Sequence, residues 1–407
     1  MSTALSLVDN RIACRECGHK SHSILDHIVE VHGMTVAEYV AKHPDAPTMS
    51  DALHERVDAE LKGRRRAPAP LVTELTTTMC GVTAPVDHLM PSENCLKWPE
   101  GYAWPTKGAA KKRVQRAVLA MRRNRPVYIY GEPGVGKDAA VHAFCAATRM
   151  ASLIYTFSPG TDVKRWFFSR EISTEGTSWS YGVLFRALVE GVKGRDGVAR
   201  PALILFSDVD RATPDQLEEF RLVLDTMSKR IVGPTGKVHD IFPGTQFAFT
   251  ANSCGFGDER GRMSSHQMDA SILDRMGRFI EFTHLHWDDE SAILRSKFPT
   301  LVSVADHIFD ELGASAKALR AAIAGKGDVT LYADLTHRGL CEILAECEDL
   351  VWLKDGEAPA NLLKSGFKAW LDRLDTDNRM NAKRLIDASI SGGYFVADDE
   401  DDEEDGY

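Results

Sequence analysis

The feature that most constrains this chain is a glycine-rich segment between an apolar run and a helical pattern. Residues 127–130 (VYIY) lead directly into residues 131–138 (GEPGVGKD). This order matches G-x-x-x-x-G-K between a strand and a helix, where glycines let backbone N–H groups face phosphates. The start of the helix adds a positive dipole, and Lys137 reaches the β- and γ-phosphates. The segment predicts a phosphate-binding loop, against the alternative of a glycine-rich turn that binds nothing.

Apolar runs alternate with helical patterns from about residue 91 to residue 285. The five runs lie at residues 127–130, 153–157, 202–206, 247–250 and 279–282. Fully apolar strands between helices are typical of a parallel α/β sheet covered on both faces. Residues 288–390 are rich in Ala and Leu at helical spacing, which predicts an all-helical second part.

The charge of the chain is concentrated in one place. Lys and Arg number 49 against 59 Asp and Glu, for a net charge of -10 over 407 residues. Eight of these acids are consecutive, from Asp398 to Asp405, and without them 51 acids face 49 bases, a net of -2. The nearly neutral body weakens any claim of strong nonspecific nucleic-acid binding. We expect a disordered, solubilising tail; the alternative is a tail that docks on a basic surface and competes there with nucleic acid.

The composition excludes several classes of protein. Hydrophobic content of 43% and charged content of 27% are those of a soluble globular protein. No apolar run approaches the ~20 residues of a membrane span. The first residues, MSTALSLVDNR, lack the basic start and long apolar core of a signal peptide. We therefore expect a cytoplasmic protein without membrane contact, in which closely spaced Cys are metal ligands before they are disulfides.

One pair of Cys has the spacing of a Zn²⁺ site. Cys14-x2-Cys17-x9-His27-x4-His32 places four ligands in a short segment. Ser23 and Gly33 are expected to begin and end a helix carrying both His, with Ile24, Ile28 and Val31 on its apolar side; Thr35 and Glu38 form a capping box for 36–43. So small a unit needs a metal to fold. A metal-free hairpin is the alternative, and His19, His22 or His43 could replace His27.

The Mg²⁺-binding positions depart from the usual pattern. We predict that ATP is bound by the loop residues Gly131, Glu132, Pro133, Gly134, Val135, Gly136, Lys137 and Asp138. The residue after the lysine is normally Ser or Thr, and the residue ending the partner strand is normally Asp. Here Asp138 and Ser207 stand in these places, followed by Asp208. We interpret this as an exchange in which Asp138, Ser207 and Asp208 form one Mg²⁺ site; the alternative is two independent losses and a weak or inactive ATPase.

These motifs, in this order, resemble AAA+ ATPases of the MoxR group, and within it the CobS cobaltochelatase subunits. The matching segments are FSDVDRATPD at 206–215, TAN at 250–252, GFGD at 255–258, MD at 268–269, LDR at 273–275 and LTHR at 335–338. The resemblance covers about three quarters of the chain. It implies a P-loop AAA+ parallel sheet followed by a helical lid.

The resemblance also implies catalytic roles. Lys137 would contact the phosphates, and Asp208 would stand where a water-polarising Glu is expected. Asn252 would be sensor 1, Arg275 the arginine finger acting on a neighbouring subunit, and Arg338 sensor 2. Each Arg could instead form only a surface salt bridge, and Arg278 is close enough to be confused with Arg275.

A finger that acts on a neighbour implies a homo-oligomeric ring, a hexamer in this family. Family rings grip substrates through pore loops, for which 164–168 and 177–182 are candidates. Their aromatic residues could instead be ordinary core. The resemblance also implies a protein partner with a metal-ion-dependent adhesion-type domain.

The Cys/His segment resembles the Ros/MucR-type bacterial zinc finger, through HGMT at 32–35 and EY at 38–39. That resemblance implies DNA binding. The finger has few cations, however, so a protein-docking role is equally supported. The basic residues Arg64 to Arg66 could add nonspecific DNA affinity or be a solvated linker.

We therefore expect five regions: a finger at 10–47, a linker at 48–90 with little fixed structure over 63–85, an ATPase core at 91–287, a lid at 288–390 and an acidic tail at 391–407. The expected function is an ATP-hydrolysing ring that remodels a macromolecular partner. Two alternatives remain open, a nucleotide-bound scaffold without turnover and a DNA-directed ATPase recruited by the finger.

Overall fold

The computed structural model describes residues 11–51, 53, 75–173, 176–225, 229–257, 267–326, 329–359 and 361–390. The chain divides into two compact units, residues 1–70 and 71–407. The predicted tail at 391–407 and the Arg64–Arg66 cluster lie outside the described residues. In the described parts of the chain, every helix is too short or too polar to cross a lipid bilayer.

The first unit is a small ββαα structure. Strands β1 (Ile12–Ala13) and β2 (Lys20–Ser21) pair antiparallel, followed by helices α1 (Leu25–His32) and α2 (Val36–Lys42). Its core consists of Cys14, Ile24, Ile28 and Tyr39, each almost fully buried. The prediction that Val31 lies on the buried side of α1 is wrong, because this side chain is 62% exposed. Four buried side chains are too few to stabilise such a unit alone.

The helix ends of this unit follow the local sequence. Gly33 adopts the left-handed conformation at the end of α1, and Thr35 with Glu38 forms the predicted capping box of α2. Ser23 is not the N-cap, because Ile24 occupies that position and the Ser23 hydroxyl accepts from the Leu25 N–H at 3.4 Å.

The second unit contains the predicted parallel sheet. Its five strands are β5 (Val127–Tyr130), β6 (Ala151–Thr156), β11 (Ala202–Ser207), β14 (Gln246–Ala251) and β15 (Arg278–Glu281), in spatial order β15-β5-β14-β11-β6. All neighbours are parallel. The chain therefore crosses over a sheet face between strands, and the strand ends that precede the crossovers meet at one edge.

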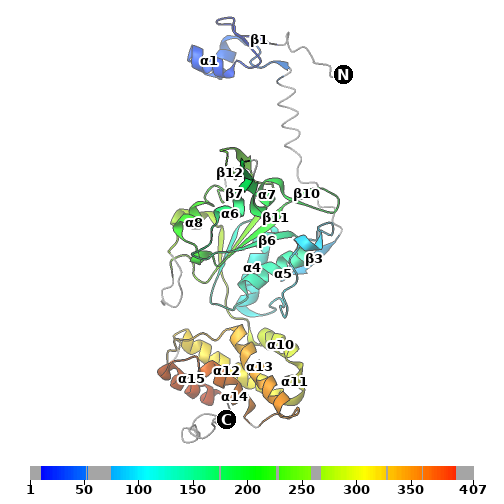
Figure 1. The fold of residues 1–407 in the computed structure, drawn as a ribbon, viewed down its shortest axis with the longest axis vertical. Coiled ribbons are helices and arrows are strands. Elements are labelled where there is room, and N and C mark those ends of the chain that lie inside the picture. The colour runs from blue at the N-terminus through cyan, green and yellow to red at the C-terminus, as the bar shows by residue number, and fades with distance from the viewer. Residues whose placement is uncertain are drawn as a thin grey trace. The chain divides into compact units, whose positions relative to one another are not determined.

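Both faces of this sheet are buried. On β11, Leu203 and Leu205 pack with helices α4 (Gly108–Arg122) and α5 (Lys137–Thr148), while Ile204 and Phe206 pack on the opposite side. Side chains alternate across a strand, so two covered faces require an apolar residue at every position. Figure 1 shows α4 and α5 on one side of the sheet and α6, α7 and α8 on the other. This explains why the apolar runs were readable from the sequence.

Smaller elements of this unit precede, connect or follow the sheet strands. They are η1 (Ser92–Asn94), α6 (Lys164–Phe167), β7 (Phe168–Ser173), β8 (Gly176–Tyr181), α7 (Val183–Glu190), β9 (Val192–Lys193), β10 (Ala199–Arg200), η2 (Val209–Arg211), α8 (Pro214–Glu218), β12 (Arg230–Val232), β13 (Val238–Asp240) and α9 (Ala270–Arg275). Of the two pore-loop candidates, the first is partly core, because Phe167 is only 3% exposed. The second forms strand β8, which pairs with β7 and carries Trp179 at 39% exposure.

The expectation of little fixed structure over 63–85 is wrong for its second part. Strands β3 (Thr76–Met79) and β4 (Val82–Pro85) form an antiparallel hairpin whose Met79 and Ala84 are buried beside α4 and α5. The turn residues Cys80 and Gly81 both have positive φ, 48° and 79°. Two such residues suit the tight turn of a hairpin, and β-branched Thr favours a strand.

The region after the sheet is helical, as predicted. It comprises α10 (Trp287–Lys297), α11 (Pro299–Ala305), α12 (His307–Ile323), α13 (His337–Leu353), α14 (Leu362–Leu371) and α15 (Thr376–Ser389). These helices have a hydrophobic core of their own, which includes Phe309, Leu344 and Phe367. Residues 287–390 are called the lid.

Candidate nucleotide site and metal centre

Lys137 lies at the centre of the glycine-rich loop. Its ammonium donates to the Gly131 and Glu132 carbonyls at 2.9 and 3.0 Å and to Asn252 Oδ1 at 2.8 Å. These bonds use all three ammonium donors. Burial lowers the pKa of Lys137, while nearby carboxylates oppose that shift. The structure thus brings the predicted lysine and the predicted sensor 1 asparagine into direct contact, at the edge where β5 and β14 end.

Asp138 and Ser207 also meet. Ser207 Oγ donates to Asp138 Oδ2 at 3.2 Å, across 69 residues of sequence. The other oxygen, Asp138 Oδ1, is buried and has no hydrogen-bond partner among the described residues. A buried carboxylate oxygen without a partner is costly unless a cation or donor reaches it. Asp138 and Ser207 are therefore neighbours, and Asp138 Oδ1 remains available to a ligand.

Asp208 and Asp210 complete a carboxylate cluster around Lys137. Asp208 has φ 52°, a left-handed conformation that Asp tolerates better than most residues. Burial raises the pKa of Asp208, and the neighbouring Asp138 and Asp210 carboxylates raise it further. Crowded carboxylates of this kind are the usual environment of a divalent cation.

Asp210, which received no role from the sequence, holds the turn at Asn252 and Ser253 in place. Its Oδ2 accepts from the backbone N–H groups of Asn252 and Ser253 at 3.0 and 2.9 Å. Asp210 is 1% exposed. It therefore positions Asn252, a role created only when β14 returns beside β11. The signal that could have pointed to Asp210 is its place in the FSDVDRATPD segment at 206–215.

The glycine-rich loop requires its glycines. A Cβ on Gly131 would clash with the Phe282 carbonyl oxygen, and one on Gly134 would lie 2.6 Å from Thr336 Cβ. Thr336 is the N-cap of lid helix α13. The loop thus lies tightly between the end of β15 and the start of a lid helix.

A pocket adjoins this loop on the lid side. Its lining includes Tyr102, Gly136, Ala139, Leu285 and His337. The lining combines glycine and alanine residues of the loop region with apolar and aromatic side chains. This combination suits a planar base attached to phosphates.

A buried ion network borders the pocket and was missed in the sequence. Glu290 receives two bonds from Arg320, at 2.6 and 3.0 Å, and one from His337 Nδ1 at 3.1 Å. Burial raises the pKa of Glu290, but these bonds lower it to about 2. Burial lowers the pKa of His337, but its hydrogen bonds with Cys341 and Glu290 raise it to about 9. The network fixes α10, α12 and α13 against one another at the pocket.

The two predicted arginines lie elsewhere. Arg275 ends helix α9, donates to the Ser271 carbonyl at 2.6 Å and lies 3.8 Å from Asp225 Oδ2. Arg338 is exposed in the first turn of α13, next to the pocket residue His337. Neither arginine is among the residues that line the pocket beside the loop.

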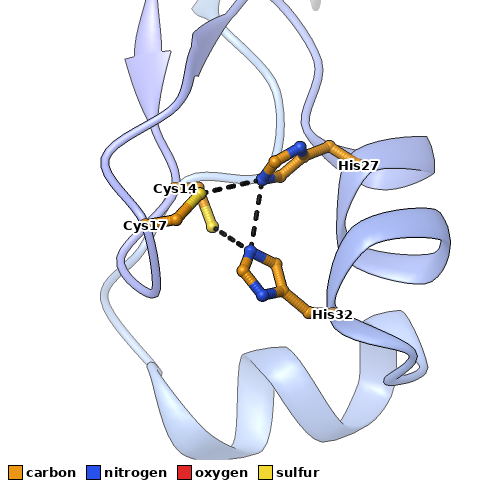
Figure 2. Close-up of side chains that lie close together, drawn as sticks. All are labelled: Cys14, Cys17, His27 and His32. Carbon is orange, nitrogen blue, oxygen red and sulfur yellow. Dashed lines mark hydrogen bonds between the residues drawn. The ribbon is translucent and has the colours of Figure 1, made fainter.

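The four predicted Zn²⁺ ligands converge in the first unit (Figure 2). Cys14 Sγ lies 3.5 Å from His32 Nε2, Cys17 Sγ lies 3.1 Å from His27 Nε2, and the two Nε2 atoms lie 3.2 Å apart. All four ligand atoms lie within 4.8 Å of one another. A tetrahedral Zn²⁺ with ordinary bond lengths places its ligand atoms ~3.3–3.8 Å apart. The donor set and spacing therefore fit this ion.

The spare histidines have other partners. His22 Nδ1 lies 3.1 Å from Ser50 Oγ, and His43 Nε2 lies 2.6 Å from Glu16 Oε1. His19 stacks on His27 with ring centroids 4.4 Å apart. Among the described residues, the cluster is formed by Cys14, Cys17, His27 and His32 alone, so the alternative ligands are not favoured.

Comparison with known proteins identifies the central region. Residues 126–276 match the AAA domain of the dynein-related subfamily. A 114-residue stretch is 31% identical to midasin of Giardia intestinalis, covering 28% of this chain and 2% of midasin. The chain thus corresponds to a very small part of that relative's length.

Solved structures are similar at low identity. The RuvB Holliday junction branch migration motor of Thermotoga maritima is 13% identical, with a TM-score of 0.41 over 70% of this chain and 77% of that one. NtrX from Brucella abortus in complex with ADP is 11% identical, with a TM-score of 0.43 over 70% and 61%. Together with the sheet order, the profile match gives residues 126–276 a P-loop AAA+ fold, followed by a helical region. The finer resemblance to MoxR and CobS stays a prediction.

Proposed function

We propose that this chain, which contains an AAA domain at residues 126–276, binds ATP with Mg²⁺ and hydrolyses it to remodel a macromolecular partner. The observation that carries the proposal is the contact of Lys137 with Asn252 beside the Asp138–Ser207 pair. One group reaches phosphates, one orients water and two can hold a cation. Such a set at the end of parallel strands suits phosphoryl transfer.

The residues divide the reaction as follows. Lys137 must leave at least one carbonyl of its own loop to bind a β- or γ-phosphate oxygen. Asn252, held by Asp210, orients the attacking water, and Asp208 accepts a hydrogen bond from it. Asp138 and Ser207 would hold Mg²⁺, which would supply positive charge against the phosphates. The Asp138 Oδ1 atom, buried without a partner among the described residues, supports this site.

Binding and turnover are tested separately. Lys137→Ala is expected to abolish high-affinity ATP binding, measured by fluorescence with a nucleotide analogue, because the buried site loses the cation that reaches the phosphates. Lys354→Ala, a change at an exposed lid position outside the pocket lining, serves as the charge-matched control and should weaken binding far less. Equal binding by the Lys137→Ala variant and the unmodified chain would contradict the proposal.

The exchange of Asp138 and Ser207 gives a sharper prediction. Asp138→Ser leaves two hydroxyls and Ser207→Asp puts a second carboxylate beside the first, so each should lower Mg²⁺-dependent turnover by about tenfold or more. The double change restores one hydroxyl and one carboxylate, and should recover most of the loss. Steady-state hydrolysis across Mg²⁺ concentrations measures this. If the double change is no better than the sum of the singles, the exchange is wrong.

The proposal includes a ring of identical subunits, which the family resemblance makes a hexamer. It also includes recruitment of the partner through a Zn²⁺-bound finger. The finger fits either DNA or a protein, and an adhesion-type partner domain is one such protein. Two alternatives have observations of their own. The changed Asp138 and Ser207 favour a scaffold without turnover, and the finger favours DNA-directed activity. Hydrolysis measured with and without duplex DNA separates them: no turnover supports the scaffold, and strong stimulation supports the DNA-directed ATPase.

A further inference from the structure

Helix α4 has a basic face, and the helix itself contains no acidic residue. From residue 107 to residue 125 the chain has eight cations and no acid. Those exposed on the helix are Lys111, Lys112, Arg116 and Arg122, with Arg123 at its end. At 3.6 residues per turn they fall within an arc of about 140°. This set of five is called the α4 basic face.

The opposite side of α4 is core. Val114, Ala117, Val118 and Met121 are buried in the core that α4 shares with the sheet. In the described structure, the ion pairs of this segment are those of Lys107 with Asp288 and Arg113 with Glu281, neither of which is in the α4 basic face. The face therefore stands out from a body that is nearly neutral without residues 398–405.

We propose that the acidic segment at residues 398–405 docks on the α4 basic face and blocks it from other polyanions. Eight consecutive acids face five exposed cations. Eight extended residues span ~26 Å, and a helix of fifteen residues spans ~22 Å. Charge and length are therefore complementary.

The placement of α4 in the fold supports this occupant. The backbone N–H groups of Thr106 and Lys107 donate to the Asp289 carboxylate at 2.8 and 3.1 Å, where lid helix α10 begins. The acidic segment follows lid helix α15, so both belong to the same unit. An ion-pair contact of this kind weakens as salt rises. The acidic segment is present at a high effective concentration because it is part of the same chain or ring. The inference does not depend on ATP hydrolysis.

The test uses a chain lacking residues 398–405 and a fluorescent peptide of residues 391–407. The peptide is expected to bind the shortened chain, with affinity that falls as salt rises. Lys112→Gln/Arg116→Gln/Arg123→Gln should weaken binding about tenfold or more. Lys237→Gln/Lys326→Gln/Lys354→Gln removes the same charge from exposed positions outside α4 and should change it little. Equal weakening by both variants, or no peptide binding, overturns the proposal.

A duplex DNA probe separates the acidic segment from an external occupant. If the segment blocks the face, a 20-base-pair duplex should bind the shortened chain at least several-fold more tightly than the full chain, and the α4 changes should remove that gain. Equal duplex affinity of the full and shortened chains contradicts the proposal, because the face is then open to external polyanions at all times.

Discussion

Extraction of Zn²⁺ from the full chain is expected to unfold residues 11–51 and leave the AAA domain folded. The four buried side chains of this unit cannot offset the entropy of ordering it. A structural Zn²⁺ contributes ~10–16 kcal/mol in comparable small units. Hydrogen exchange should therefore become fast across α1 and α2 after chelation, while strand β5 stays protected.

Ligand variants sharpen this prediction. His27→Asn should remove the bound zinc, measured as metal per chain, whereas His19→Asn should retain it. His19 is the matched control because it stacks on His27 but lies outside the four-ligand cluster. Persistent protection of α1 in a chain that has lost its metal would instead support the metal-free hairpin.

The parts of the fold that the sequence predicted are those fixed by local pattern. The five sheet strands were readable because both faces are covered, so β11 is apolar at every position up to Ser207. The capping box at Thr35 and Glu38 and the Cys/His spacing are likewise short-range signals. Each of these features needs no knowledge of distant residues.

The features that escaped prediction depend on distant chain segments. Asp210 acquires its role only because β14 pairs beside β11 and brings two backbone N–H groups to it. Glu290, Arg320 and His337 come from three lid helices. The β3–β4 hairpin was missed for a different reason: its turn is Cys80-Gly81, which lacks the Asn or Asp that usually marks such a turn.

Arg275→Ala is expected to lower ATP turnover by ~10³-fold or more with little effect on ATP binding, because an arginine finger acts mainly on the transition state. Arg278→Ala is the matched control, since Arg278 is exposed at the start of β15 three residues away. In this chain Arg275 is held by Ser271 and lies near Asp225. Asp225→Asn should therefore affect turnover far less than loss of the arginine. Similar losses for both arginine variants would remove the special role of Arg275.

Mixing two inactive variants distinguishes a finger acting on a neighbour from one acting within its own subunit. In a ring, an Arg275→Ala subunit keeps an intact Lys137 site, and an adjacent Lys137→Ala subunit still provides Arg275. If the finger acts on a neighbour, such a mixture has complete sites at mixed interfaces and should recover activity that neither variant has alone. If Arg275 acts within its own subunit, every site in the mixture lacks one group and no activity returns. Recovery that depends on total protein concentration would follow from assembly, because dilution separates the two contributing subunits.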